Sequence, residues 1–254
     1  MDGYGPAMAM DGSVGRGSTV GDLDRPSLSE FRIDPEGIPA TVYDPGGGAG
    51  LLLLGHGGGR SKDSKRFVEL ARTYANRTGL VVVCMDAVDH GERKPPNARP
   101  GLPPLWHSGA VEQMVGDWQA CVGALAHLGS PIAYVGFSMG SIFGVPVVAA
   151  IRSIKAAVFV AGGVPDGSEF DDPLLGPLIL EAASNLDVPE VLMINMTKDE
   201  TFSIEGAHAM FDAIPGPSKQ LMFWEGRHDD WPDEAIEQST RFVVTHRVAA
   251  DICT

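Results

Sequence analysis

The chain has 254 residues, of which 44% are hydrophobic and 20% charged, which is typical of a globular protein large enough for one domain with a full core. Its formal net charge of −14 disfavours nucleic acids and anionic membrane surfaces as partners, because their phosphates would be repelled. The three cysteines, Cys84, Cys121 and Cys253, make no disulfide framework, and the odd count fits a reducing compartment.

The N-terminal stretch has neither the basic start nor the apolar core of a secretory signal, and no later segment is long and apolar enough to span a membrane. Residues 1–25 are rich in Gly, Asp, Ser and Met and have no periodicity. We therefore expect a cytoplasmic protein with a flexible N-terminal tail at 1–25 and one domain at 26–254.

Strand and helix patterns alternate along the rest of the chain. Strand patterns, by alternation or by short apolar runs, occur at 31–33, 38–43, 51–54, 80–85, 131–135, 156–161, 191–194 and 220–224. One helical pattern ends near residue 76, and the others cover 110–128, 139–151, 205–213 and 233–246. Residues 162–187 interrupt this rhythm and are predicted to form a small lid-like excursion. The alternation predicts an α/β fold with a mostly parallel sheet of about seven or eight strands and helices on both faces.

The sequence Gly136-Phe-Ser138-Met-Gly140 stands between an apolar strand and a helical segment. In that context Gly-x-Ser-x-Gly indicates a sharp strand-to-helix turn that exposes the serine hydroxyl above the edge of a sheet. The flanking glycines let neighbouring backbones approach closely. Ser138 is therefore the candidate nucleophile.

A serine hydroxyl needs a base to take its proton and an acid to orient that base. Asp199 follows the strand at 191–194, and His228 follows the strand at 220–224, in the order expected for this topology. Glu200 stays open as the functional acid in place of Asp199. Asp229 and Asp230 are poorer candidates, because they share a turn with His228.

Together with the His56-Gly57-Gly58-Gly59 loop, these features resemble the α/β-hydrolase superfamily from about residue 28 to the C-terminus. The compact size and small lid look most like its dienelactone hydrolase-like or small serine carboxylesterase branch. Dienelactone hydrolases carry a cysteine where this chain has Ser138, which puts a lactone-specific activity in doubt. The resemblance implies the three-layer α/β-hydrolase fold.

By the same resemblance, Ser138 is the nucleophile, His228 the general base and acid, and Asp199 the orienting carboxylate. The oxyanion hole would use the backbone N–H of Met139 and one from the glycine loop, with Gly58 the first choice. Gly57 and Gly59 are the next candidates from that loop.

Other candidates are weighed against ordinary packing. Trp231, which lies just after His228, is the better candidate for a pocket residue, and for Trp106 ordinary core packing is at least as strong an interpretation. We expect His56 to hold the glycine loop by hydrogen bonds. His90, with Asp86 and Arg93, is expected to brace a loop.

The expected reaction is hydrolysis of a small-molecule carboxylic ester through an acyl-serine intermediate. Action on a thioester, an amide or a carbon–carbon bond, acyl transfer, and non-catalytic ligand binding stay open as alternatives, as does a homodimer. The seven histidines have no metal-binding spacing, and the glycine loop lacks the Gly-Lys-Ser/Thr ending of a phosphate-binding loop. We therefore expect neither a metal nor a cofactor.

Overall fold

A computed structural model describes residues 27–47, 50–96, 109–165, 172–188 and 190–252 of the chain. The predicted tail at 1–25 and the candidate pocket residue Trp106 lie outside these ranges. So does part of the predicted excursion at 162–187, namely residues 166–171.

The described residues form one eight-stranded sheet with the order β1-β2-β4-β3-β5-β6-β7-β8. Its strands are β1 (Ser29–Ile33), β2 (Ala40–Asp44), β3 (Leu51–Gly55), β4 (Val81–Met85), β5 (Pro131–Phe137), β6 (Ala156–Val160), β7 (Glu190–Met196) and β8 (Lys219–Trp224). Strand β2 is antiparallel to both of its neighbours, and every pairing from β4 to β8 is parallel. The predicted mostly parallel sheet is confirmed.

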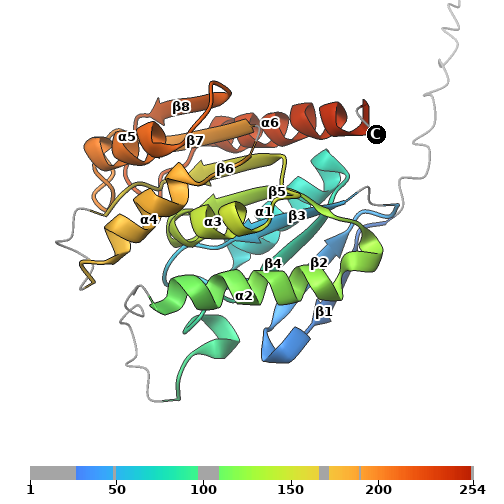
Figure 1. The fold of residues 1–254 in the computed structure, drawn as a ribbon. Helices are drawn as coiled ribbons and strands as arrows, with labels where there is room; N and C mark the ends of the chain where they lie inside the picture. The colour runs from blue at the N-terminus through green and yellow to red at the C-terminus, as the bar shows by residue number, and fades with distance from the viewer. Residues whose placement is uncertain (1–26, 48–49, 97–108, 166–171, 189, 253–254) are drawn as a thin grey trace, which may run out of the picture.

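Helices cover both faces of this sheet, as expected from the apolar strands (Figure 1). The helices are α1 (Lys65–Thr78), α2 (Gly109–Ala124), α3 (Met139–Ala150), α4 (Leu175–Ser184), α5 (Ile204–Ala213) and α6 (Asp233–Ile252), with 3₁₀ turns at Pro35–Gly37, Gly91–Arg93 and Ala126–Leu128. Leu51 and Leu53 pack in the core shared with α2, α3, α4 and α5, whereas Leu52 and Leu54 pack in the core shared with α1 and α6. The run of four leucines is therefore buried on both sides, which makes the layering three deep.

The excursion after β6 contains helix α4. This helix buries Leu175, Ile179 and Ala183 in the same core cluster as α3 and α5. The apolar residues that marked the excursion in the sequence thus form part of a packed helix layer. Leu174, just before the helix, is 61% exposed.

Gly136 and Gly140 allow α3 to start close against the sheet. A Cβ atom on Gly140 would lie 2.4 Å from the Gly55 carbonyl oxygen, and one on Gly136 would lie 2.2 Å from the Gly140 carbonyl oxygen. Both contacts are with backbone atoms, which cannot move aside without displacing β3 or α3. These two positions require glycine, and they fix the height at which α3 leaves β5.

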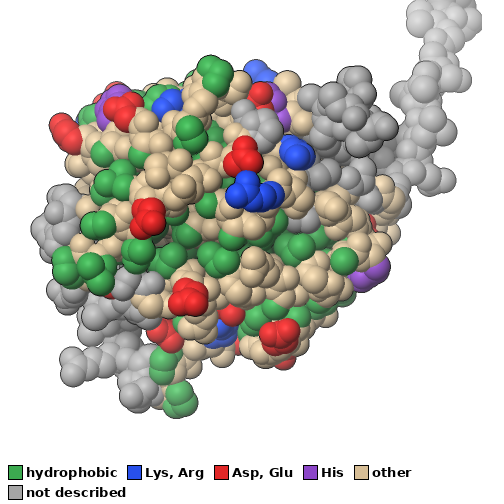
Figure 2. Space-filling view, viewed as in Figure 1, with side chains coloured by type: hydrophobic (Ala, Val, Ile, Leu, Met, Phe, Trp, Pro, Cys, Tyr) green, Lys and Arg blue, Asp and Glu red, His purple; other side chains and the backbone are tan. Residues whose placement is uncertain are grey.

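The face seen in Figure 2 carries separate acidic side chains dispersed among hydrophobic and neutral ones, in keeping with the excess of acidic residues. Across the described part of the chain, no helix combines the length and apolar character needed to cross a bilayer.

Candidate active site

Ser138 occupies the turn between β5 and α3. Its backbone has φ 53° and ψ −114°, a strained conformation for a residue with a side chain. The turn is held by the Ser138 N–H, which donates to the Val160 carbonyl at 2.8 Å, and by the Ser141 hydroxyl, whose single hydrogen faces the Gly136 and Val160 carbonyl oxygens, each 2.8 Å from Oγ. These hydrogen bonds to β5 and β6 therefore hold the backbone of Ser138 in its strained conformation, and the residue is 5% exposed.

Three side chains form a hydrogen-bonded chain at the carboxyl ends of β5, β7 and β8. Ser138 Oγ lies 2.7 Å from His228 Nε2. His228 Nδ1 lies 2.9 and 2.8 Å from Asp199 Oδ1 and Oδ2. The side chains of His228 and Asp199 are 14% and 1% exposed, so water has little access to the bond between them. The structure thus brings together the three residues that the sequence nominated for nucleophile, base and acid.

The Asp199 carboxylate is held from its own loop. Its Oδ1 atom accepts hydrogen bonds from the backbone N–H groups of Thr201, at 2.8 Å, and Phe202, at 2.9 Å. Because a carboxylate can only accept, the His228 Nδ1 atom that faces it carries the proton. The Nε2 atom therefore presents its lone pair to the Ser138 hydroxyl.

Glu200 lies beside the site but contacts the backbone of His228. Its Oε2 atom accepts from the His228 backbone N–H at 3.1 Å, and its Oε1 atom accepts from Arg227 Nη2 at 2.8 Å. The hydrogen bonds from Arg227 lower the pKa of Glu200 to about 2. The geometry therefore favours Asp199 over Glu200 as the partner of the imidazole.

The glycine loop begins at the end of β3 and reaches the turn that carries Ser138. A Cβ atom on Gly57 would lie 3.6 Å from Ser138 Cβ and from the Phe137 carbonyl oxygen. Gly58 and Gly59 turn the chain back, with the Arg60 N–H donating to the Gly57 carbonyl at 3.2 Å and Gly59 at φ 67°. The loop therefore passes Ser138 at Gly57 and faces solvent by Gly59.

His56 ties this loop to the segment after β4. The Ala87 N–H donates to Nε2 at 3.0 Å, so Nδ1 carries the proton and donates to the Gly57 carbonyl at 2.9 Å. Burial lowers the pKa of His56 to about 4, so the ring is neutral at physiological pH. The ring matches the loop-holding role that was expected from the sequence.

The depressed pKa of His56 makes stability depend on pH. The unfolded chain takes up a proton on this histidine below its ordinary pKa of 6.5, whereas the folded chain does so only near 4. Stability is therefore expected to fall by about 3 kcal/mol as the pH drops through this window, at about 1.4 kcal/mol per pKa unit. Urea unfolding of the wild type and His56→Gln at pH 7 and pH 5 measures the upper part of this window, where about 2 kcal/mol of the loss is expected. Equal pH dependence in both proteins would contradict it.

A buried ion network braces the neighbouring loops. Lys62 is fully buried, and its Nζ lies 3.0 Å from Asp86 Oδ2 and also pairs with Glu92, while its backbone N–H donates to Asp86 Oδ1 at 2.9 Å. Arg93 donates to the Asp86 carbonyl at 3.1 Å and to Asp117 at 2.6 Å. This is the loop-bracing arrangement expected of Asp86 and Arg93, with Lys62 as its centre. His90 is not part of this network. Its Nδ1 atom lies 2.8 Å from the Val88 carbonyl oxygen of its own loop, and its Nε2 atom has no hydrogen-bond partner among the described residues.

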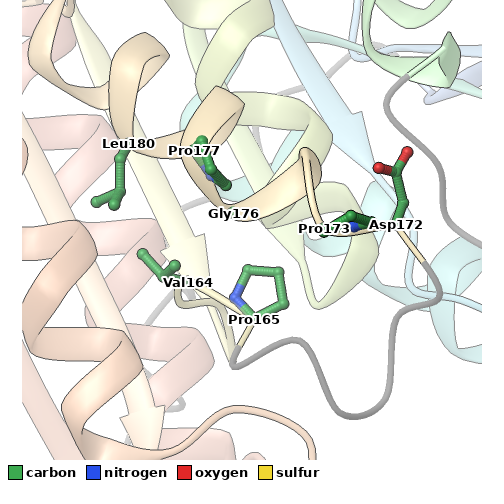
Figure 3. Close-up of a pocket in the computed structure, with 7 residues that line it drawn as sticks. All are labelled: Val164, Pro165, Asp172, Pro173, Gly176, Pro177 and Leu180. Carbon is green, nitrogen blue, oxygen red and sulfur yellow. The ribbon is translucent and has the colours of Figure 1, made fainter.

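The candidate pocket residue Trp231 lies in the core between β5, α1 and α6. The residue is 7% exposed, its ring lies 4.6 Å, between centroids, from that of Phe137, and its Nε1–H donates to the His228 carbonyl at 2.6 Å. A separate hollow of about 330 Å³ lies between the segment after β6 and α4, lined by Val164, Pro165, Asp172, Pro173, Gly176, Pro177 and Leu180 (Figure 3). Figure 3 shows the side chains of Val164 and Leu180 on facing sides of this mainly apolar hollow.

Metal ligands do not gather in the described part of the chain: it contains no group of three or more His, Cys, Asp or Glu side chains arranged to hold an ion. The prediction that the site uses no metal remains a prediction.

Comparison with known proteins gives the family. A model of the alpha/beta hydrolase family matches residues 51–244. This match covers most of the chain and includes Ser138, Asp199 and His228. The protein therefore belongs to the alpha/beta hydrolase family. No curated protein matches its sequence.

Solved structures with the same fold include several esterases. A cold-adapted esterase from an Arctic intertidal metagenomic library superposes with a TM-score of 0.70 and 22% identity, over 94% of this chain and 99% of that one. Est1E from Butyrivibrio proteoclasticus, solved with ferulic acid bound, gives a TM-score of 0.67 and 16% identity over 86% and 99%. The Pyrococcus furiosus esterase Pf2001 gives 0.67 and 15% over 86% and 92%. At these identities the likeness is one of fold, and the dienelactone hydrolase-like branch stays a prediction.

Proposed function

We propose that the protein is a serine hydrolase that cleaves carboxylic esters of small molecules through an acyl-Ser138 intermediate. The observation that carries this proposal is the hydrogen-bonded chain from Ser138 Oγ through the His228 ring to Asp199. The His228 ring has the tautomer needed for a base, because the proton is on Nδ1 and the lone pair of Nε2 faces the serine hydroxyl.

In the first half-reaction, Ser138 Oγ attacks the ester carbonyl carbon while His228 Nε2 takes the hydroxyl proton. The carbonyl oxygen becomes an oxyanion in a tetrahedral intermediate. Collapse of this intermediate breaks the bond to the alcohol oxygen, which leaves with the proton from His228. Asp199 stabilises the imidazolium that exists between the two transfers.

In the second half-reaction, water replaces the alcohol. His228 Nε2 takes a proton from the water as its oxygen attacks the acyl carbon, and then returns a proton to Ser138 Oγ as the carboxylic acid departs. The enzyme regains its starting protonation state, and one ester and one water give one acid and one alcohol.

The proposed oxyanion hole uses the backbone N–H groups of Met139 and Gly58. Met139 is the first residue of α3, so its N–H has no acceptor within the helix, and the positive end of the helix dipole lies there. The Gly57 carbonyl accepts from Arg60 and His56 inside the loop, and in a planar trans peptide the Gly58 N–H points the opposite way. Two such donors stabilise an oxyanion, each typically contributing about 3 kcal/mol.

Several of the structural neighbours are esterases, which makes an ester the first bond to test. We expect the protein to hydrolyse members of a p-nitrophenyl ester series from acetate to decanoate, and the chain-length optimum reports the size of the acyl pocket. A fluorophosphonate probe should modify one residue per chain, which peptide mass spectrometry assigns to Ser138. Labelling without ester hydrolysis would favour another acyl bond, whereas absence of both would reject the proposed function.

A further inference from the structure

We propose that Trp231 and Arg66 are positioning residues that hold His228 within reach of Ser138. This inference rests on the proposed serine hydrolase function and identifies what keeps the base in place. The ring of His228 is hydrogen-bonded through its two nitrogens to Asp199 and Ser138, and it lies 5.8 Å, between centroids, from the ring of Phe202. Its position also depends on the turn that carries it, where Arg227, Asp229 and the neighbouring Asp230 are exposed.

Trp231 links this turn to the strand of the nucleophile. Its Nε1–H donates to the His228 carbonyl at 2.6 Å. Its ring lies against Phe137, the residue that immediately precedes Ser138, with 4.6 Å between centroids. One side chain thus contacts the backbone of the base and the ring next to the nucleophile, so it sets the spacing between β5 and the histidine turn.

Arg66 fixes Trp231 from helix α1. Its guanidinium carbon lies 3.9 Å from the centroid of the Trp231 ring, a cation–π contact. Its Nη1 donates to the Asp229 carbonyl at 2.9 Å, and its Nη2 lies 3.4 Å from the Trp231 carbonyl. Arg66 therefore bonds the main chain on both sides of Asp230, in addition to covering the indole ring.

The backbone of His228 is consequently held at two points by different elements. Glu200, on the loop after β7, accepts from its N–H, and Trp231 donates to its carbonyl. Because proton transfer depends on the 2.7 Å spacing between Nε2 and Oγ, a displacement of about 1 Å is expected to slow it by about 100-fold. Loss of the Trp231 bond should therefore slow the chemical steps, whereas substrate contacts remain.

The arrangement allows variants that fold. Arg66 and Trp231 line an open hollow of about 420 Å³ between α1 and α6, so shortening Arg66 admits solvent and leaves no sealed cavity. Trp231→Phe keeps an aromatic ring against Phe137 and removes the N–H donor. Arg66→Lys keeps a positive charge near the indole but loses the fork that serves two carbonyls.

Matched controls come from the same helix and from a second buried tryptophan. Arg72 is on α1 and pairs with exposed Glu30, far along the helix from the histidine turn. Trp118 is fully buried on the opposite face of the sheet, and its Nε1 has no hydrogen-bond partner among the described residues. Arg72→Met and Trp118→Phe therefore repeat the chemical changes without touching His228.

The experiment measures kcat and KM on the best p-nitrophenyl ester, the rate of fluorophosphonate labelling and the Tm of each protein, with all kinetics run well below every Tm. We expect Trp231→Phe to lower kcat and the labelling rate about 10- to 100-fold with KM changed less than about threefold. Arg66→Met should lower kcat about tenfold, and Arg66→Lys should lower it by a smaller factor. Each of the two control variants should change kcat by less than about twofold.

Each outcome bears on one proposal. A wild type that neither hydrolyses esters nor reacts with the probe rejects the serine hydrolase function, and the positioning role with it. An active wild type whose Trp231→Phe and Arg66→Met forms keep kcat within twofold rejects the positioning role alone. Equal losses in Trp118→Phe would also reject it, since the effect would then be a general one of core packing.

Discussion

Replacing Ser138 by alanine is expected to lower kcat for ester hydrolysis by about 10⁶-fold, down to the residual rate given by binding and the oxyanion hole. The reason is chemical. Alanine has no atom that can attack the carbonyl carbon, and His228 Nε2 loses the group whose proton it takes at 2.7 Å. The same substitution should abolish fluorophosphonate labelling. Single-turnover hydrolysis with excess enzyme measures a rate too slow for steady-state assays.

Ser141→Ala is the matched control for this prediction. Ser141 lies three residues later, in the first turn of α3, and its hydroxyl oxygen is 2.8 Å from the Gly136 and Val160 carbonyl oxygens. Its removal is expected to destabilise the fold by about 1–3 kcal/mol, because buried acceptors lose a donor, while labelling of Ser138 persists. If Ser138→Ala retained more than about a hundredth of wild-type kcat with the same substrate, Ser138 would not be the nucleophile.

Much of the fold followed from local patterns in the sequence. The strand at 51–54 and the glycine-flanked serine were recognisable because burial on both faces and a forced close approach leave few residue choices at those positions. Helix α4 was not recognised, because Gly176 and Pro177 interrupt its pattern and its burial depends on contacts with α3 and α5. A helix stabilised mainly by its neighbours carries a weak signal in its own sequence.

The candidate site likewise contains residues that the sequence could predict and residues that only the folded structure identifies. The order of Ser138, Asp199 and His228 could be placed from the strand map, since each follows a strand of a parallel sheet. The choice between Asp199 and Glu200 needed the geometry, because adjacent residues differ only in the direction their side chains take. Arg66 gave no signal, since it lies on an amphipathic helix far away in the sequence and meets the histidine turn only in the folded chain.

Asp199→Asn is expected to lower kcat by about 10⁴-fold while preserving the fold. The backbone N–H groups of Thr201 and Phe202 both donate to Oδ1, so the asparagine oxygen will occupy that position and its amide nitrogen will replace Oδ2. The nitrogen then donates to His228 Nδ1, which must become an acceptor. The ring proton moves to Nε2, and the base presents a hydrogen to Ser138 where a lone pair is needed.

Glu200→Gln separates this tautomer effect from a simple loss of charge, since both changes remove one carboxylate from the same loop. The glutamine oxygen can still accept from the His228 backbone N–H, so kcat is expected to stay within about threefold of wild type. Steady-state kinetics with one ester, together with the Tm of each variant, make the comparison. A large loss in Glu200→Gln beside a mild one in Asp199→Asn would assign the orienting carboxylate to Glu200. A large loss in Asp199→Asn beside a mild one in Glu200→Gln would assign it to Asp199. The two N–H groups that donate to Oδ1 would then determine which nitrogen of His228 can act as the base.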